Sequence, residues 1–154
     1  MTERHRSIAI VMALLQRPSD GRVLTVRHGP ASSYSAGRLT VIGGHLEEGE
    51  FCDEGAAREL LEESGVYVDE GALEFCQLAH FRTKDDLVIG VAFTAQRWEG
   101  EPYNREQGKH TALVWVDPGN PPNDCHPFTE AVLQNFAAGV LYAQVPAATG
   151  GGAS

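Results

Sequence analysis

The chain has 154 residues, of which 42% are hydrophobic, and a formal net charge of −9 with a pI near 5.0. This length suits one domain with a substantial hydrophobic core. The acidic balance argues against a surface that binds a nucleic acid polymer or an anionic membrane, because both need a basic patch.

The three cysteines lie far apart and form no CxxC pair. They indicate reduced thiols in a cytoplasmic protein, and neither a disulfide framework nor a zinc site. The basic N-terminus precedes an apolar run without a small-residue cleavage site, so we expect a first strand there and no signal peptide. No apolar stretch approaches the roughly 18 residues of a membrane helix.

Two strands are predicted first, at residues 7–16 and 22–27, and a turn signal at residues 18–21 should join them into a hairpin. A Gly/Pro/Ser-rich loop over residues 28–38 follows. A ligand could meet this loop, either at Tyr34 or at the basic residues in and beside it. The next strand, at residues 39–42, leads into a glycine pair. These glycines are expected to form a turn, since glycine allows positive φ and a close approach of backbone to ligand.

A helix is predicted from about Phe51 to Ser64, because small and apolar residues recur there at helical spacing. Gly65 is a natural left-handed stop. Three glutamates fall at positions i, i+3 and i+4, on one face that we expect to be exposed. Like charges at this spacing weaken a helix by about 0.2–0.5 kcal/mol a pair, and a hard cation would reverse that cost. Taken alone, an ordinary solvated acidic face is the alternative.

Further strands are expected at residues 66–68, 72–83, 87–98 and 111–116, with a hairpin turn at Asp85-Asp86. Pro127 should open a second amphipathic helix over residues 127–142, with Val132, Leu133 and Phe136 facing inward. This order of elements predicts an α/β fold, with helices on both sides of a mixed sheet. We expect one domain over residues 1–146 and a flexible tail over residues 147–154.

The segment from Gly44 to Val66 fits, at every position, the pattern Gly-x5-Glu-x7-Arg-Glu-U-x-Glu-Glu-x-Gly-U, where U is apolar. Chance would produce this match in on the order of 10⁻⁷ of such chains. The chain therefore resembles the Nudix hydrolases, and the resemblance implies an α/β/α sandwich with this helix and the C-terminal helix on opposite sides. The family commonly has proline where this chain has Ile42. The matching residues are Gly44, Glu50, Arg58, Glu59, Leu60, Glu62, Glu63, Gly65 and Val66.

The resemblance implies hydrolysis of a nucleoside diphosphate linked to another group X, with Mg²⁺ or Mn²⁺ as cofactor. Glu59, Glu62 and Glu63 would hold the metal, and the Gly43 carbonyl and Glu106 would complete its shell. Glu101 is the fallback for Glu106. The general base would be Glu59, Glu62 or Glu106. Arg58 would orient the glutamates, and Glu50 would pair with Arg58 or hold a metal water.

The segments outside this motif are most similar to MutT-related nucleoside triphosphate pyrophosphohydrolases, which release a nucleoside monophosphate and pyrophosphate. The substrate expected is a (d)NTP or a modified dNTP, with 8-oxo-dGTP as a specific hypothesis. The similarity places Asp124 and Phe128 where the base is read or stacked, with Phe81 and Tyr34 as the opposite wall. Core packing or helix capping is the alternative for the two phenylalanines. Gly44 and His45 are also expected to contact substrate.

Other functions stay open within the same resemblance. A regulatory module of the family could bind a nucleotide or ADP-ribose without catalysis. Such modules often lose the glutamates of the motif, and this chain keeps them all. A hydrolase of nucleotide sugars or ADP-ribose is a second alternative, and diphosphate isomerisation and RNA decapping are two more. The expected partner is a small nucleotide, with neither a nucleic acid polymer nor a membrane. A homodimer is expected because dimers are frequent in the family.

Overall fold

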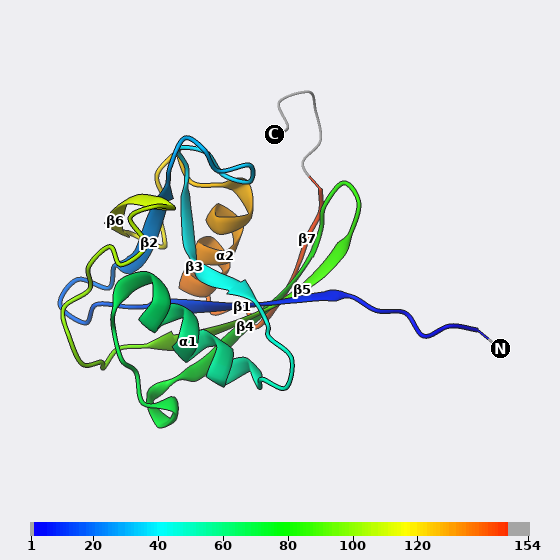
Figure 1. Cartoon of the computed structure of the whole chain (residues 1–154), viewed down its shortest axis with the longest axis horizontal. Coiled ribbons are helices and arrows are strands. Elements are labelled where there is room, and N and C mark those ends of the chain that lie inside the picture. Colours follow the sequence, from blue (N-terminus) through cyan, green and yellow to red (C-terminus); the bar gives the residue numbers. More distant parts are fainter. Residues whose placement is uncertain (1, 148–154) are drawn as a thin grey trace.

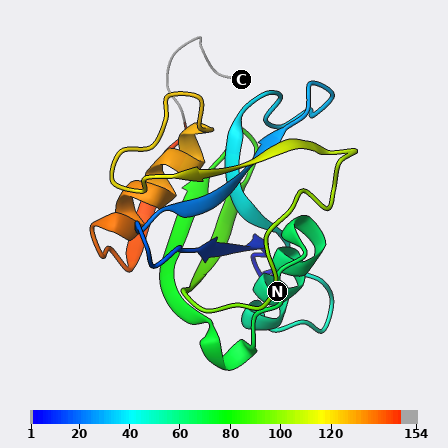
Figure 2. The ribbon, with the colours of Figure 1, turned by 90° about the vertical axis from the view of Figure 1, so that its left-hand side faces the viewer.

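The computed structural model describes residues 2–147, except for the side chain of Glu70. Seven strands form one mixed sheet in the order β6-β2-β3-β1-β5-β4-β7. Helices α1 (Cys52–Ser64) and α2 (Pro127–Ala137) cover opposite faces of it (Figures 1 and 2). The α/β sandwich predicted from the sequence is therefore confirmed. The other elements are β1 (Ile8–Leu15), β2 (Val23–His28), β3 (Leu39–His45), the 3-10 turn η1 (Glu70–Ala72), β4 (Glu74–Arg82), β5 (Leu87–Ala95), β6 (His110–Val116) and β7 (Tyr142–Val145).

The central strand β1 divides the core in two, because successive side chains of a strand point to opposite faces. Met12 and Leu14 belong to the cluster under α2, and Ala13 and Leu15 belong to the cluster under α1. The inward face predicted for the second helix is confirmed: Val132 and Leu133 are fully buried, and Phe136 packs against the same cluster. Neither helix in the described part of the chain has the length and hydrophobicity needed to span a bilayer.

The predicted hairpin of the first two strands is wrong. Strand β3 lies between β1 and β2, and only an isolated bridge between Gln16 and Val23 joins them directly. Both edges of β1 are already used, since β1 pairs antiparallel with β3 and parallel with β5. The turn at residues 18–21 thus reverses the chain without setting up a ladder. The hairpin predicted at Asp85-Asp86 is confirmed, because β4 and β5 pair antiparallel across that turn.

The glycine pair also differs from the prediction. Gly43 and Gly44 continue strand β3, and neither has a positive φ. Both glycines allow other groups to come close to the backbone. A Cβ on Gly43 would clash with the carbonyl oxygen of Val11, and a Cβ on Gly44 would clash with the carboxylate of Glu59. Glycine is needed here for space rather than for turn conformation.

The C-terminal helix is shorter than predicted. It ends at Ala137, and Gly139 then takes a left-handed conformation with φ of 72°. The chain continues into strand β7, which the sequence analysis missed and which pairs parallel with β4. This strand forms one edge of the sheet. Of the tail predicted to be flexible, residues 148–154 lie outside the described part.

We expect the Gly43→Ala variant to be less stable than the wild type by about 1–3 kcal/mol, because the added methyl group overpacks main-chain atoms of a central strand. The same Cβ would stand 3.2 Å from Met12 Cα. Chemical denaturation would measure the change in the free energy of unfolding. Gly119→Ala is the matched control, since its nearest neighbour, Asp117 Oδ1, lies at an ordinary 3.5 Å. Equal stability of the two variants would contradict the packing account.

Candidate active site

Helix α1 begins and ends where the sequence predicts. Phe51 caps its N-terminus, and the Phe51 amide donates to Glu54 Oε1 at 2.8 Å. Gly65 follows the last turn in the left-handed conformation, with φ of 70°, and its amide donates to the Leu61 carbonyl. These two ends fix which residues of the motif are helical and therefore which share a face.

The acidic face of α1 is not exposed as a whole, so that expectation is wrong. Glu59 and Glu63 are only 8% and 7% exposed, whereas Glu62 faces solvent. The predicted apolar face is corrected too, since Leu61 is exposed. The helix packs with its glutamates toward strand β3, where Gly44 leaves room for the Glu59 carboxylate. Two carboxylates are therefore buried in the domain.

Arg58 gathers the carboxylates of the motif. Its guanidinium donates to both oxygens of Glu50, through Nε at 2.7 Å and an Nη at 3.0 Å. The other Nη donates to Glu59 Oε1 at 3.0 Å and to Glu62 Oε2 at 3.2 Å. The Nη that binds Glu50 also donates to the carbonyl of His45. This fork lowers the pKa of Glu50 and raises that of Arg58, so both stay charged.

Glu63 has the most strongly perturbed carboxyl group of the site. Burial raises its pKa well above the usual range, and the nearby charges of Glu59 and Glu106 raise it further. The Gly43 amide opposes this shift by donating to Glu63 Oε2 at 3.0 Å. Burial also raises the pKa of Glu59, although Arg58 opposes it. The site therefore concentrates negative charge that the protein neutralises only in part.

The loop between β5 and β6 caps the C-terminal end of α1. The Tyr103 amide donates to the Ser64 carbonyl and the Arg105 amide to the Glu63 carbonyl, while the Arg105 side chain donates to the Leu61 carbonyl at 2.8 Å. These bonds satisfy carbonyls that a helix end leaves without partners. They also bring Glu106 close enough for its charge to raise the pKa of both buried glutamates.

The donor set fits a hard divalent cation by its chemistry. Carboxylate oxygens from Glu59, Glu63 and Glu106 repel one another, and Mg²⁺ or Mn²⁺ selects such ligands. As the side chains stand in residues 2–147, no three acidic, histidine or cysteine groups converge on one point. Glu59 is turned toward Arg58, and Glu106 toward Lys109 Nζ at 3.3 Å. Binding would require these carboxylates to turn from their cationic partners toward the ion.

A cavity of about 440 Å³ reaches Glu63 on the α2 side of the sheet. It is lined by Glu63 and by predicted substrate residues from four separate segments of the chain. Those residues are Gly44, His45, Tyr34, Phe81 and Phe128, and beside them lies Gly43, which the sequence predicted as a metal ligand. Sequence reasoning missed most of the remaining lining, such as Ile10 and Met12 of β1 and Thr129 of α2. Alternation along β1 could have indicated its two residues, but only the sheet order places them beside β3.

The aromatic walls differ from the prediction. Phe81 and Phe128 pack on each other, with ring centroids 3.8 Å apart, so they form one wall instead of two opposite ones. Tyr34 is exposed and stacks on His126 at 4.7 Å. Asp124 is not among the residues that line the cavity, and its carboxylate accepts from Arg27 at 2.7 Å. Glu101 is exposed and lies in the loop before Glu106.

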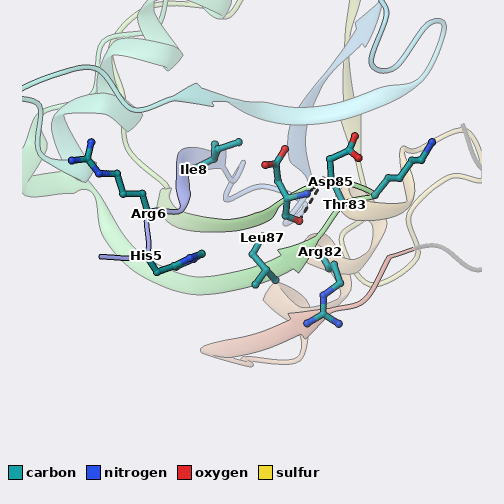
Figure 3. A pocket seen from close by; sticks show the side chains of 9 residues that line it. His5, Arg6, Ile8, Arg82, Thr83, Asp85 and Leu87 are labelled. Atoms are coloured by element: carbon teal, nitrogen blue, oxygen red, sulfur yellow. Dashed lines mark hydrogen bonds between the residues drawn. The ribbon is translucent and has the colours of Figure 1, made fainter. Parts of the chain in front are cut away.

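A second cavity, of about 360 Å³, lies between the N-terminal segment and the β4–β5 turn (Figure 3). It shares Ile8, Thr83 and Asp86 with the first cavity. Its cationic side chains do not converge on one point: Figure 3 shows Arg6 and Arg82 pointing away from each other. The second cavity therefore lacks the focused charge of the carboxylate site.

Comparisons with known proteins agree with this fold and motif. The NUDIX domain family matches residues 4–136, and the chain belongs to that family. Mouse oxidized purine nucleoside triphosphate hydrolase is 37% identical over 78 residues, which are 48% of this chain and 47% of the mouse protein. The chain thus spans about half the length of that relative in the match. Escherichia coli 8-oxo-dGTP diphosphatase is 26% identical over 83% of this chain and 95% of that protein.

Solved structures support the fold. A MutT NUDIX hydrolase from Burkholderia pseudomallei superposes with a TM-score of 0.72 at 22% identity, covering 84% of this chain and 98% of the other. The MutT protein from Methanosarcina mazei Go1 gives 0.72 at 21% identity, covering 89% and 97%. At these identities the likeness establishes the fold alone. Nudix hydrolases generally need a divalent metal ion.

We expect the Arg58→Lys variant to lose about 1–3 kcal/mol of stability. A lysine keeps the charge but cannot bind both Glu50 oxygens and Glu59 at once, so partly buried carboxylates lose charge-assisted hydrogen bonds. Urea denaturation would measure the difference. The matched control is Arg22→Lys, at an exposed pair with Asp20, where the expected change is within about 0.5 kcal/mol. If Arg58→Lys changed the free energy of unfolding as little as the control does, the hydrogen bonds of the Arg58 guanidinium would not contribute to stability.

Proposed function

We propose that this protein is a metal-dependent nucleoside triphosphate pyrophosphohydrolase, which converts a (d)NTP or an oxidised dNTP into a nucleoside monophosphate and pyrophosphate. One observation carries the proposal: the buried carboxylate Glu63 lines the same cavity as the aromatic residues Phe81, Phe128 and Tyr34. A nucleotide has the matching two parts, a base that packs on aromatic rings and phosphates that bind through cations.

The carboxylates supply the ligands in this proposal. Glu59, Glu63 and Glu106 would hold the divalent cation with the Gly43 carbonyl, and Glu62, at the solvent side of the same helix, would join them. A bound divalent cation neutralises charge on the phosphate oxygens and acidifies water for the attack. The glutamates around it are then in place to accept the proton of that water. Because the chain carries a net charge of −9, the cation would also permit the anionic substrate to approach.

Arg58 and Glu50 would act on the ligands rather than on the substrate. In the metal-free arrangement Arg58 donates to Glu59 and Glu62, and both oxygens of Glu50 accept from Arg58. Such partners orient metal ligands and typically change affinity or rate by 10- to 100-fold when they are removed. Gly44 and His45 would place the β3 backbone against the phosphates, since both line the cavity next to Glu63.

The names of the relatives support an oxidised purine nucleotide as substrate. The mouse protein is named for oxidised purine nucleoside triphosphates and the bacterial protein for 8-oxo-dGTP. The cavity polarity fits a purine, because apolar side chains from β1, β4 and α2 surround it with few polar groups. We place the protein in the cytoplasm, where such nucleotides are formed, and expect it to act as a homodimer.

The test is turnover on a panel of dNTPs, oxidised dNTPs, nucleotide sugars, ADP-ribose and capped RNA, with Mg²⁺ or Mn²⁺ and product identification. We expect one triphosphate to yield monophosphate and pyrophosphate, with an oxidised purine preferred. Glu63→Gln should lower kcat/KM by on the order of 10²-fold or more, because it removes a buried ligand charge.

Glu48→Gln is the matched control for this panel, since Glu48 is an exposed glutamate in the loop before α1. Equal or better turnover of ordinary dNTPs or nucleotide sugars would overturn the preference for oxidised purines. If the protein binds one of these compounds but turns over none of them, the proposed enzymatic function is wrong, and a regulatory module is favoured.

A further inference from the structure

A buried histidine lies beside the carboxylate of Glu63, at the start of the strand that follows the β5–β6 loop. His110 is the first residue of β6 and is 3% exposed. Its Nε2 lies 3.5 Å from Glu63 Oε1, while Glu63 Oε2 accepts from the Gly43 amide at 3.0 Å. The two oxygens of Glu63 thus face different groups, a backbone amide of β3 and a ring nitrogen of β6.

The imidazole of His110 is held in place from several sides. Its backbone amide donates to the Glu106 carbonyl, and its carbonyl accepts from Asn104 Nδ2 at 2.7 Å. The ring meets His28 edge to face, with centroids 5.0 Å apart. His28 is fixed in turn by Thr40, whose Oγ1 lies 2.8 Å from His28 Nε2.

The chemistry of a neutral imidazole suits this position. It carries one N–H and one acceptor nitrogen, and the tautomer follows the neighbour that needs a donor. As a metal ligand Glu63 would be ionised and would offer only acceptors, so the proton would then belong on Nε2. The other nitrogen, Nδ1, is buried and has no hydrogen-bond partner within residues 2–147.

We propose that His110 is a positioning residue that directs Glu63, through Nε2–H, into the orientation in which Glu63 binds the divalent cation. This inference rests on the proposed role of Glu63 as a metal ligand. His110 does not line the cavity, and its ring would act on the site through its contact with Glu63. Together with the Gly43 amide it fixes both oxygens of one buried carboxylate, which reduces the reorganisation needed when the cation binds.

The test measures Mn²⁺ affinity by calorimetry, without substrate, in the wild type and in His110→Phe and His110→Gln. His110→Phe keeps a ring but no donor, and we expect its Kd for Mn²⁺ to rise about 10- to 100-fold. His110→Gln keeps a donor and should bind within a few-fold of the wild type. In the Glu63→Gln background, His110→Phe should cause no further loss, because the carboxylate it positions is gone.

His80→Phe is the matched control, because His80 on β4 also has a buried, unpartnered Nε2 but does not line the cavity. Its Mn²⁺ affinity should equal that of the wild type. The inference is overturned if His110→Phe binds Mn²⁺ like the wild type, or if it loses as much affinity in the Glu63→Gln background. Failure of the wild type to bind Mn²⁺ would instead overturn the proposed function.

A second measurement covers the case in which His110→Phe does not fold. Long-range ¹⁵N spectra of histidine rings in the wild type report which nitrogen carries the proton, with His110→Gln identifying the signals. The Nε2–H tautomer is expected, and its signals should shift in Glu63→Gln. A proton on Nδ1 would leave Glu63 facing an acceptor and would overturn the inference.

Discussion

The site depends on the burial of two carboxylates, Glu59 and Glu63, between helix α1 and strand β3. Buried ionised groups are unfavourable unless they are paired or bind a cation. The domain meets this cost only in part, with the fork of Arg58 on Glu59 and the Gly43 amide on Glu63. The pKa of both carboxyl groups remains raised. The charge left over is what a divalent cation would neutralise, and it connects the fold to the proposed chemistry.

The remaining elements can be understood from this arrangement. Glycines in β3 let the helix approach closely enough to bury its glutamates. The β5–β6 loop completes the C-terminal end of α1 and carries Glu106 to the same place. On the other face of the sheet, α2 and the β1 side chains form an apolar cavity that reaches Glu63. The buried carboxylates and the apolar cavity thus come from opposite sides of one sheet and meet at β3.

Local signals in the sequence predicted the helix of the motif well. The spacing of small residues and Gly65 determined both ends of α1, because capping and periodicity depend on neighbours along the chain. The motif also predicted that Arg58 would orient the glutamates, and the structure brings Arg58 to Glu50, Glu59 and Glu62. The burial of Glu59 was missed. Periodicity identifies a common face, but only the packing partner decides whether that face is buried.

Features that depend on distant segments were harder to predict. The hairpin prediction was wrong because β3, which follows β2 in sequence, pairs with the edge of β1 that β2 would have used. Strand β7 was missed, because the helix predicted over residues 127–142 runs past Gly139 and takes in Tyr142, the first residue of the strand. Asp124 was assigned to the base from local similarity, but its carboxylate is bound by Arg27, 97 residues away in sequence. No local pattern contains the information that pairs them.

The most direct test of the central claim is a crystal structure of the protein soaked with Mn²⁺, with the ion located by its anomalous scattering. The account predicts a Mn²⁺ ion in contact with the carboxylates of Glu59 and Glu63, with Glu59 turned away from Arg58 to reach it. An ion bound elsewhere, or no ion at saturating Mn²⁺ while Glu59 stays on Arg58, would contradict it. The buried carboxylates would then be a structural ion-pair network and not a metal site.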